Sequence, residues 1–236
     1  MIAGALSLQN SMHIATADLL ALIWFALCWF GFSWFAEWHA VRVPSLVSAR
    51  RALIRAWIEN IFHREVRILD STLLGNLLQG STFFASTSIV ILGGLLALLG
   101  TSEKAINIVA ELPFTARATE RIWEIKILVL ISIFVYGFFK FTWSLRQYNL
   151  VSILVGSMPE EDKAPPNYEQ YLKNTADIAS FAGENYNMGL RSYYFGFAVL
   201  TWLLNPWLMM VVTLFVVGVL YQREFRSRTL TALLQA

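Results

Sequence analysis

The chain has 236 residues, of which 57% are hydrophobic and 14% are charged, and its mean hydropathy is +0.55. A soluble domain carries roughly 25% charged residues, so this composition excludes a chain that is soluble on its own. The net charge of +2 and the lack of a Lys/Arg stripe with interleaved aromatic residues argue against a nucleic-acid partner. The single cysteine, Cys28, excludes an intrachain disulfide.

Four membrane spans are predicted from apolar stretches close to the ~20 residues that cross the hydrocarbon of a bilayer. The N-terminal segment before them has no Lys or Arg, which argues against a cleaved secretory signal. We therefore predict an all-α fold, a polytopic transmembrane bundle in one domain over 1–236. The predicted spans cover about 17–38, 73–99, 125–143 with a helical pattern continuing to about 158, and 193–221.

The distribution of Lys and Arg between these spans sets the predicted orientation. With both termini outside, the loops after the first and third spans lie inside and carry more cations than the other segments. The basic residues of the C-terminal tail, beginning with Arg223, oppose this orientation. Two half-spans in place of the fourth span, broken at Asn205-Pro206, would remove the conflict.

The segment at about 45–69 predicts an amphipathic helix at the membrane interface. Apolar residues recur at helical spacing on one side, and cations gather mostly on the other. Such a polar face suits anionic lipid headgroups or a docking partner, and the alternative is a connector that merely joins two spans. The candidate docking residues are Arg50, Arg51, Arg55, Arg64 and Arg67.

The stretch QGSTFFASTS, residues 79–88, places six amide and hydroxyl side chains inside the second predicted span. On a helix, Gln79, Thr82 and Ser86 share one side, and Ser81 and Ser88 lie beside them. Hydrocarbon offers no hydrogen-bond partners, so these side chains are expected to face inward. They would form either a close helix–helix contact or the lining of a polar path for ions or small solutes.

Two further features of the spans are candidate elements of a polar path. Lys140 follows a long apolar stretch and either extends to the interface or faces an acidic partner such as Glu37 or Asp70. Pro206 removes a backbone hydrogen bond near Trp202, and Asn205 is positioned to bond in its place.

The polar segment at about 159–191 predicts a cytoplasmic loop that contains a short helix. Tyr168, Leu172, Ile178 and Phe181 recur at near-helical intervals, and Gly183 is a plausible stop. Its apolar side is expected to pack on the end of the third span around 151–154 and on the interfacial helix around 57–62. Together they would form a small helical cytoplasmic cap.

No pattern in the sequence indicates an enzyme. The three histidines show no haem or zinc spacing, and no nucleophile–base pair or phosphate-binding glycine loop occurs. We therefore expect no catalytic residues, no cofactor and no metal.

Four separated motifs nevertheless resemble a known family. ILDSTLLGNLLQGSTFFASTSIVILGG, FFKFTWSLRQYN, NMGLRSYYF and YQREFRS are similar to a bacterial integral-membrane family catalogued as domain-of-unknown-function family 599, over about Leu19 to Ser227. The resemblance implies a four-span membrane protein without an established activity.

Two functional hypotheses remain. The first is a homo-oligomeric conduit for ions or small solutes in the cell inner membrane, because four spans enclose little polar volume alone. The second is a non-catalytic accessory or scaffold subunit of a larger membrane complex. The expected partners are the lipid bilayer with its anionic headgroups, and further copies or a membrane complex.

Overall fold

The structure is a computed structural model, and it describes the backbone of residues 2–40, 43–111, 115 and 119–235. Among the side chains, those of residues 1–15, 37, 40–42, 112–114, 116–118, 162 and 234–236 are not described. The described residues form helices and short connections, without a strand. The predicted all-α fold is confirmed.

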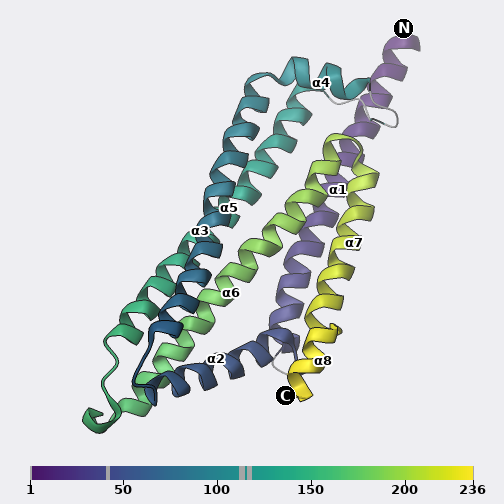
Figure 1. Cartoon of the computed structure of the whole chain (residues 1–236). Coiled ribbons are helices and arrows are strands. Elements are labelled where there is room, and N and C mark those ends of the chain that lie inside the picture. The colour runs from purple at the N-terminus through teal and green to yellow at the C-terminus, as the bar shows by residue number, and fades with distance from the viewer. Residues whose placement is uncertain (1, 41–42, 112–114, 116–118, 236) are drawn as a thin grey trace. The chain divides into compact units, whose positions relative to one another are not determined.

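The elements follow one another along the chain as long helices joined by short segments (Figure 1). They are α1 (Ile2–Ala40), α2 (Leu46–Phe62), α3 (Ile68–Gly100), α4 (Ser102–Ala110), α5 (Glu120–Gly156), the 3-10 turn η1 (Glu161–Lys163), α6 (Tyr168–Leu200), the 3-10 turn η2 (Thr201–Leu203), α7 (Pro206–Phe225) and α8 (Arg228–Gln235).

Among the described residues, four stretches are long and apolar enough to cross a membrane: Thr16–Ala36, Ile68–Gly100, Glu120–Gly156 and Pro206–Leu233. The number of candidate spans equals the predicted number, and the first three lie where they were predicted. The last does not, because α6 ends at Leu200 and α7 begins at Pro206. The predicted span at 193–221 is therefore the end of one helix, a turn and the start of another.

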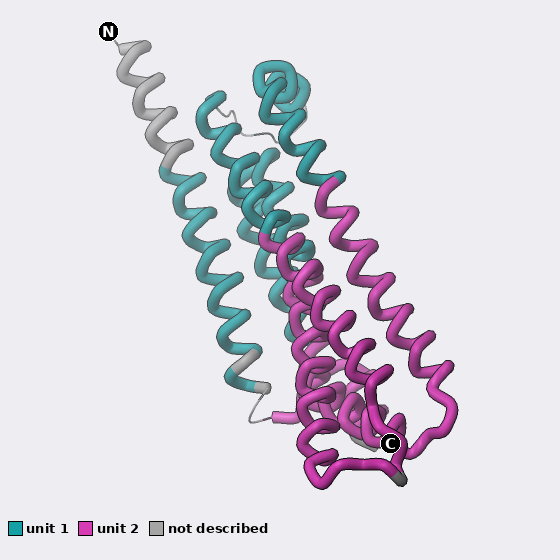
Figure 2. Tube along the Cα trace, turned by 90° about the vertical axis from the view of Figure 1, so that its left-hand side faces the viewer, with its two compact units in different colours: residues 1–39, 90–135, 192–222 teal, residues 40–89, 136–191, 223–236 magenta. Residues whose placement is uncertain are grey.

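The chain divides into two compact units (Figure 2). Unit 1 contains Met1–His39, Val90–Val135 and Ser192–Gln222, and unit 2 contains Ala40–Ile89, Tyr136–Arg191 and Arg223–Ala236. The helices α3, α5 and α6 contribute residues to both units. The single membrane domain over 1–236 stays a prediction.

Unit 1 contains most of α1 and α7 and the end of α6. In this unit α7 runs antiparallel to the end of α6 and in the same direction as α1 (Figure 1). The predicted topology, with four spans and both termini on one side, requires the first and last spans to run in opposite directions, and the parallel α1 and α7 do not fit it; the orientation of the chain in the membrane stays a prediction. The reason for the misfit is the chain reversal at Thr201–Leu203, which apolar composition alone does not reveal.

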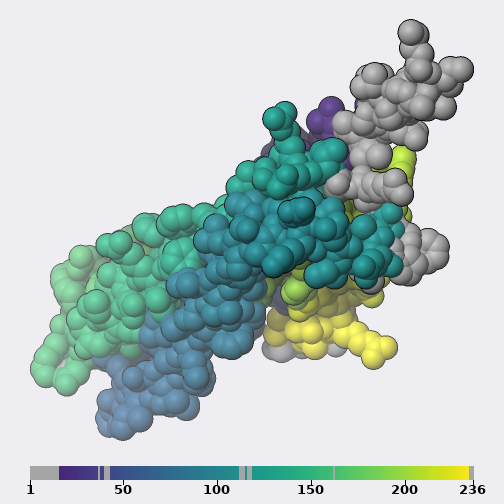
Figure 3. Space-filling view, turned by 90° about the horizontal axis from the view of Figure 1, so that it is seen from above, coloured from purple at the N-terminus to yellow at the C-terminus, as the bar shows by residue number. Residues whose placement is uncertain are grey.

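Aromatic rings hold α1 against the end of α6 in unit 1. Phe195 is fully buried, lies parallel to Trp29 with ring centroids 5.4 Å apart, and meets Phe25 edge-on at 5.8 Å. Such ring pairs contribute about 0.5–1.5 kcal/mol beyond area burial. The short helix α4, also in unit 1, lies on the face seen from above in Figure 3.

Unit 2 begins with α2, whose first turn is fixed by a capping box. The Ser45 side chain accepts from Ser48 N, the Ser48 side chain accepts from Ser45 N, and Glu224 accepts from Val47 N at 3.2 Å. The helix ends at Phe62, earlier than the predicted 69, and a turn leads into α3 at Ile68. The amphipathic helix therefore covers Leu46–Phe62 rather than the predicted 45–69.

The core of unit 2 is formed by one side of α2, the beginning of α3, the end of α5 and the beginning of α6. It contains Ile58, Ile61, Phe62, Leu74, Tyr148, Val151, Val155, Met158, Leu172, Ala176, Ala179 and Ala182. The packing predicted for the cap is thus confirmed, whereas its cytoplasmic location stays a prediction. The predicted stop at Gly183 is wrong, since α6 continues to Leu200. Phe181 is also 48% exposed rather than buried.

Candidate functional site

A buried ion pair lies in unit 1 between α1 and α5. Lys126 Nζ is 3.0 Å from Asp18 Oδ1, and the residues are 1% and 7% exposed. Trp202 of η2 completes the group, because its Nε1 donates to Asp18 Oδ1 at 2.7 Å and its carbonyl accepts from Lys126 Nζ at 2.9 Å. The ammonium also lies over the Trp202 ring, 5.3 Å from its centroid. We call these three residues the charged cluster.

Pro206 explains why the Trp202 carbonyl is available to a lysine. In a continuous helix the amide of residue 206 would donate to the carbonyl of residue 202, and proline has no such amide hydrogen. Lys126 takes the place of this donor. Asn205, the predicted replacement, instead accepts from Trp207 N at 2.9 Å and caps the start of α7.

An ion pair in this position is costly to maintain in a membrane helix bundle. Each charge loses its hydration, and only the partner charge and the surrounding hydrogen bonds offset that loss. Charges inside membrane proteins therefore usually mark ion pathways, proton relays or substrate sites. The charged cluster is the strongest candidate site among the described residues.

Sequence reasoning missed both charges of the cluster. Asp18 and Lys126 fall at the beginning of the predicted spans at 17–38 and 125–143, yet neither is among the predicted site residues. A usable signal exists in α1, because Asp18 lies three and seven residues before Ala21 and Phe25, on the side of the helix that is buried. An acidic residue that continues an apolar stripe in a predicted span indicates a buried partner charge.

The polar stretch of α3 is divided between two sides of the helix. Ser81 and Ser88 are fully buried, and the Ser81 hydroxyl lies 3.2 Å from that of Ser144 on α5 in unit 2. Gln79, Thr82 and Ser86 are exposed. The prediction that all these side chains face inward is therefore wrong for the last three.

The reason is that a hydroxyl on a helix does not need a partner from another helix. Thr82 donates to the carbonyl of Leu78 at 2.9 Å, and Thr87 donates to that of Phe83 at 2.8 Å. Such bonds satisfy an outward-facing hydroxyl within its own helix.

Lys140, the predicted charge of the third span, bonds to amides rather than to an acid. Its Nζ donates to Asn185 Oδ1 at 3.2 Å, and Asn185 Nδ2 donates to Gln147 Oε1 at 3.0 Å. The ammonium lies 5.6 Å from the centroid of the Tyr136 ring. Of the acids considered as partners, Asp70 pairs with Arg64, and the side chain of Glu37 is outside the described residues.

The arginines predicted to meet headgroups all have protein partners in unit 2. Arg50 Nη1 donates to Gly183 O at 3.1 Å, Arg51 pairs with Glu184 at 2.6 Å, Arg55 lies 3.8 Å from Asp177, Arg64 pairs with Asp70 at 2.8 Å, and Arg67 donates to the carbonyls of Met158 and Pro159 at 2.7 and 3.1 Å. These contacts hold α2 and the following turn against α3, α5 and α6. Contact with headgroups stays a prediction for the side chains that remain exposed.

Two of these arginine contacts are substantially buried. Asp70 is fully buried, and its Oδ1 accepts from both Arg64 and Trp57 Nε1, each at 2.8 Å. Burial lowers the pKa of the Arg50 guanidinium from its ordinary value, whereas the nearby carboxylates of Glu184 and Glu224 act in the opposite direction. Both contacts join secondary-structure elements, so their role is structural.

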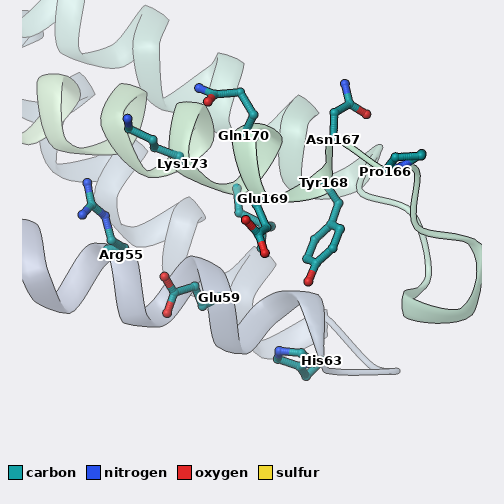
Figure 4. A pocket seen from close by; sticks show the side chains of 10 residues that line it. Arg55, Glu59, His63, Pro166, Asn167, Tyr168, Glu169, Gln170 and Lys173 are labelled. Carbon is teal, nitrogen blue, oxygen red and sulfur yellow. The ribbon is translucent and has the colours of Figure 1, made fainter.

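A polar groove of about 670 Å³ lies between α2 and the first turns of α6 in unit 2 (Figure 4). Glu59 of α2 and Glu169 of α6 point into the space between the two helices. Arg55 and Lys173 supply positive charge to the same lining, and His63 pairs with Glu161 at 3.1 Å. A groove that combines both charges at an open surface suits a small polar or zwitterionic solute.

Metal binding has no support among the described residues, where no three His, Cys, Asp or Glu side chains form a group that could hold an ion. The absence of a cofactor and of catalysis stays a prediction.

Long apolar helices with a buried ion pair among them define a multi-pass helical membrane protein. The chain belongs to the family described as "Protein of unknown function, DUF599", whose profile matches residues 20–229. This match confirms the family resemblance seen in the sequence motifs. No curated protein and no solved structure matches the chain.

Proposed function

We propose that the protein is a homo-oligomeric conduit for ions or small polar solutes in the inner membrane, with the charged cluster as the gate of its path. The observation that carries the proposal is the Lys126–Asp18 pair, buried in a bundle whose other surfaces are largely apolar. A protein that only needed rigidity could fill this space with apolar side chains at equal or lower cost. The presence of two opposite charges at this buried position favours a role in moving ions or charged solutes.

The geometry gives each member of the cluster a distinct task. Asp18 supplies a carboxylate that a cation could meet, and Lys126 neutralises it in the closed arrangement. Trp202 holds both partners, through its indole N–H and through its carbonyl. An ion that replaces the ammonium beside Asp18 would find the carboxylate already positioned.

Assembly from several copies follows from the exposed polar side of α3. Gln79, Thr82 and Ser86 face away from the core of their own chain. In an oligomer this side of α3 could face another copy or a shared lumen, and either arrangement would remove the amide of Gln79 from lipid. The accessory-subunit alternative has less support, because the arginines that would dock a partner are bonded within the chain.

Flux through liposomes containing the purified protein tests the proposal. We expect wild-type protein to dissipate gradients of at least one probe among Na⁺, K⁺, H⁺, Cl⁻ and small zwitterions. The variants Lys126→Met and Asp18→Asn should change the rate or the ion preference by about tenfold or more. Lys104→Gln, which removes an exposed cation of α4 outside the charged cluster and the polar groove, is the matched control and should leave flux unchanged.

Two results would contradict the conduit. Liposomes that remain tight to every probe, although the inserted protein is folded and oligomeric, would exclude it. A stoichiometric partner that co-purifies in mild detergent with a monomer of this chain would favour the accessory subunit instead.

A further inference from the structure

An apolar groove of about 530 Å³ lies between α1 and α7 in unit 1. Its lining includes Cys28, Gly31 and Phe35 from α1 and Leu214, Gly218 and Tyr221 from α7. The groove is hollow because three of these positions carry small side chains or none. A Cβ added at Gly31 or at Gly218 would meet no atom within 4 Å.

The length of the groove corresponds to one leaflet of a bilayer. From Leu27 to Phe35 the rise along α1 is about 12 Å, and from Leu214 to Tyr221 along α7 it is about 10 Å. Half of the ~30 Å hydrocarbon layer is about 15 Å. The groove therefore has room for the hydrocarbon of a single leaflet along its length.

One end of the groove carries the aromatic residues expected at the membrane interface. The rings of Phe35 and Tyr221 lie 6.3 Å apart there, and Trp38, which is 49% exposed, follows three residues later on α1. Trp and Tyr gather at the level of the headgroups. The other end, near Leu27 and Leu214, lies deeper in the predicted spans.

The residues around the groove indicate which kind of molecule can occupy it. Leu27, Trp34 and Phe215 are 65%, 77% and 69% exposed, so the groove opens on a surface that has to face lipid. Water would find few polar partners in such a lining. A helix about 10 Å across would displace more than 530 Å³ over the same length.

We propose that this groove binds one acyl chain of a membrane phospholipid, with its headgroup at the Phe35–Tyr221 end. The chain fills the space left by Gly31, Cys28 and Gly218 and joins α1 to α7. This site is separate from the charged cluster and does not depend on the conduit.

Native mass spectrometry of protein purified in mild detergent tests the proposal. The wild-type chain should retain a phospholipid, and Gly31→Leu or Gly218→Leu should reduce retention about tenfold, because the new side chain occupies the groove. Gly93→Leu is the matched control: Gly93 lies on an open side of α3, where an added Cβ also meets nothing, and retention should be unchanged. Equal retention in all four proteins, or detergent adducts alone, would overturn the proposal.

The only cysteine of the chain gives a second readout that does not depend on substitution. Cys28 lines the groove, so an apolar maleimide should label it several-fold faster after delipidation than before. Adding phospholipid back should restore protection. A labelling rate that does not respond to lipid would contradict the proposal even if the leucine variants fail to fold.

Discussion

Replacing Lys126 by Met tests the charged cluster directly, because it removes the cation and keeps an unbranched side chain. In this variant Asp18 keeps the hydrogen bond from Trp202 Nε1 but loses its countercharge. Asp18 is only 7% exposed, so water cannot replace that charge. Breaking one partner of a buried pair destabilises a protein by about 3–5 kcal/mol. We expect the free energy of unfolding to fall by that amount.

The double variant, Asp18→Asn with Lys126→Met, should be less destabilised than the sum of its parts. The double variant buries no charge at this site, and the amide oxygen of Asn can accept from Trp202 Nε1. We therefore expect the two substitutions to be coupled by about 1–3 kcal/mol in the free energy of unfolding. The exposed control Lys173→Met should remain within about 0.5 kcal/mol of wild type.

Equilibrium unfolding in mixed detergent micelles, followed by circular dichroism, supplies the four free energies of the cycle. If Lys126→Met changes the stability by less than about 0.5 kcal/mol, the pair carries no net energy. The assignment of a buried charged site would then be wrong.

Three further predictions follow from the contacts in unit 2. Gly189→Ala should destabilise the protein by about 1–3 kcal/mol, because a Cβ there would lie 2.6 Å from the buried Phe141 ring. Gly75→Ala is the control, because a Cβ at Gly75 meets open space and should not destabilise the protein. Equal thermal unfolding temperatures of the two variants would refute this packing. Ser81→Leu should destabilise the monomer by about 1–3 kcal/mol through overpacking, whereas Ser86→Leu should leave it unchanged and act only on oligomer mass measured by light scattering. The pKa of Glu160 lies below its ordinary value because Lys163 donates a hydrogen bond to its carboxylate, so NMR titration should show a higher Glu160 pKa in Lys163→Gln than in wild type. Any stability from this contact is present above the pKa that Glu160 has in the unfolded chain, and it is lost as the pH falls through the lower pKa of the folded chain.

The sequence predicted the helices better than their directions. Apolar composition located the first three spans, and the pattern at 168–172 predicted packing against 58–62, because burial there follows helical periodicity. The residues just before and just after the turn at Thr201–Leu203 are apolar, so hydropathy merged the end of α6 with α7 into one span, and only Asn205-Pro206 marked the break.

The candidate site was less predictable because lipid and protein interior are both apolar. Gln79 and Ser81 are both polar and lie two residues apart, yet Gln79 is exposed and Ser81 is fully buried against Ser144 of α5. The charged cluster joins residues from α1, α5 and η2. Its members are separated by 76 residues or more, and single-sequence patterns do not report contacts at that range.

The turn before Pro206 also constrains how the chain enters the membrane during synthesis. α6 is not among the stretches apolar enough to insert alone, whereas the stretch that begins at Pro206 is. Because the end of α6 packs on α1 and runs antiparallel to α7 in unit 1, we expect it to enter the membrane together with α7 as a helical hairpin, which adds one crossing to the four candidate spans. A nascent chain truncated at Leu204 would carry Phe195 and Trp202 without α7, and we expect quality-control proteases to remove it.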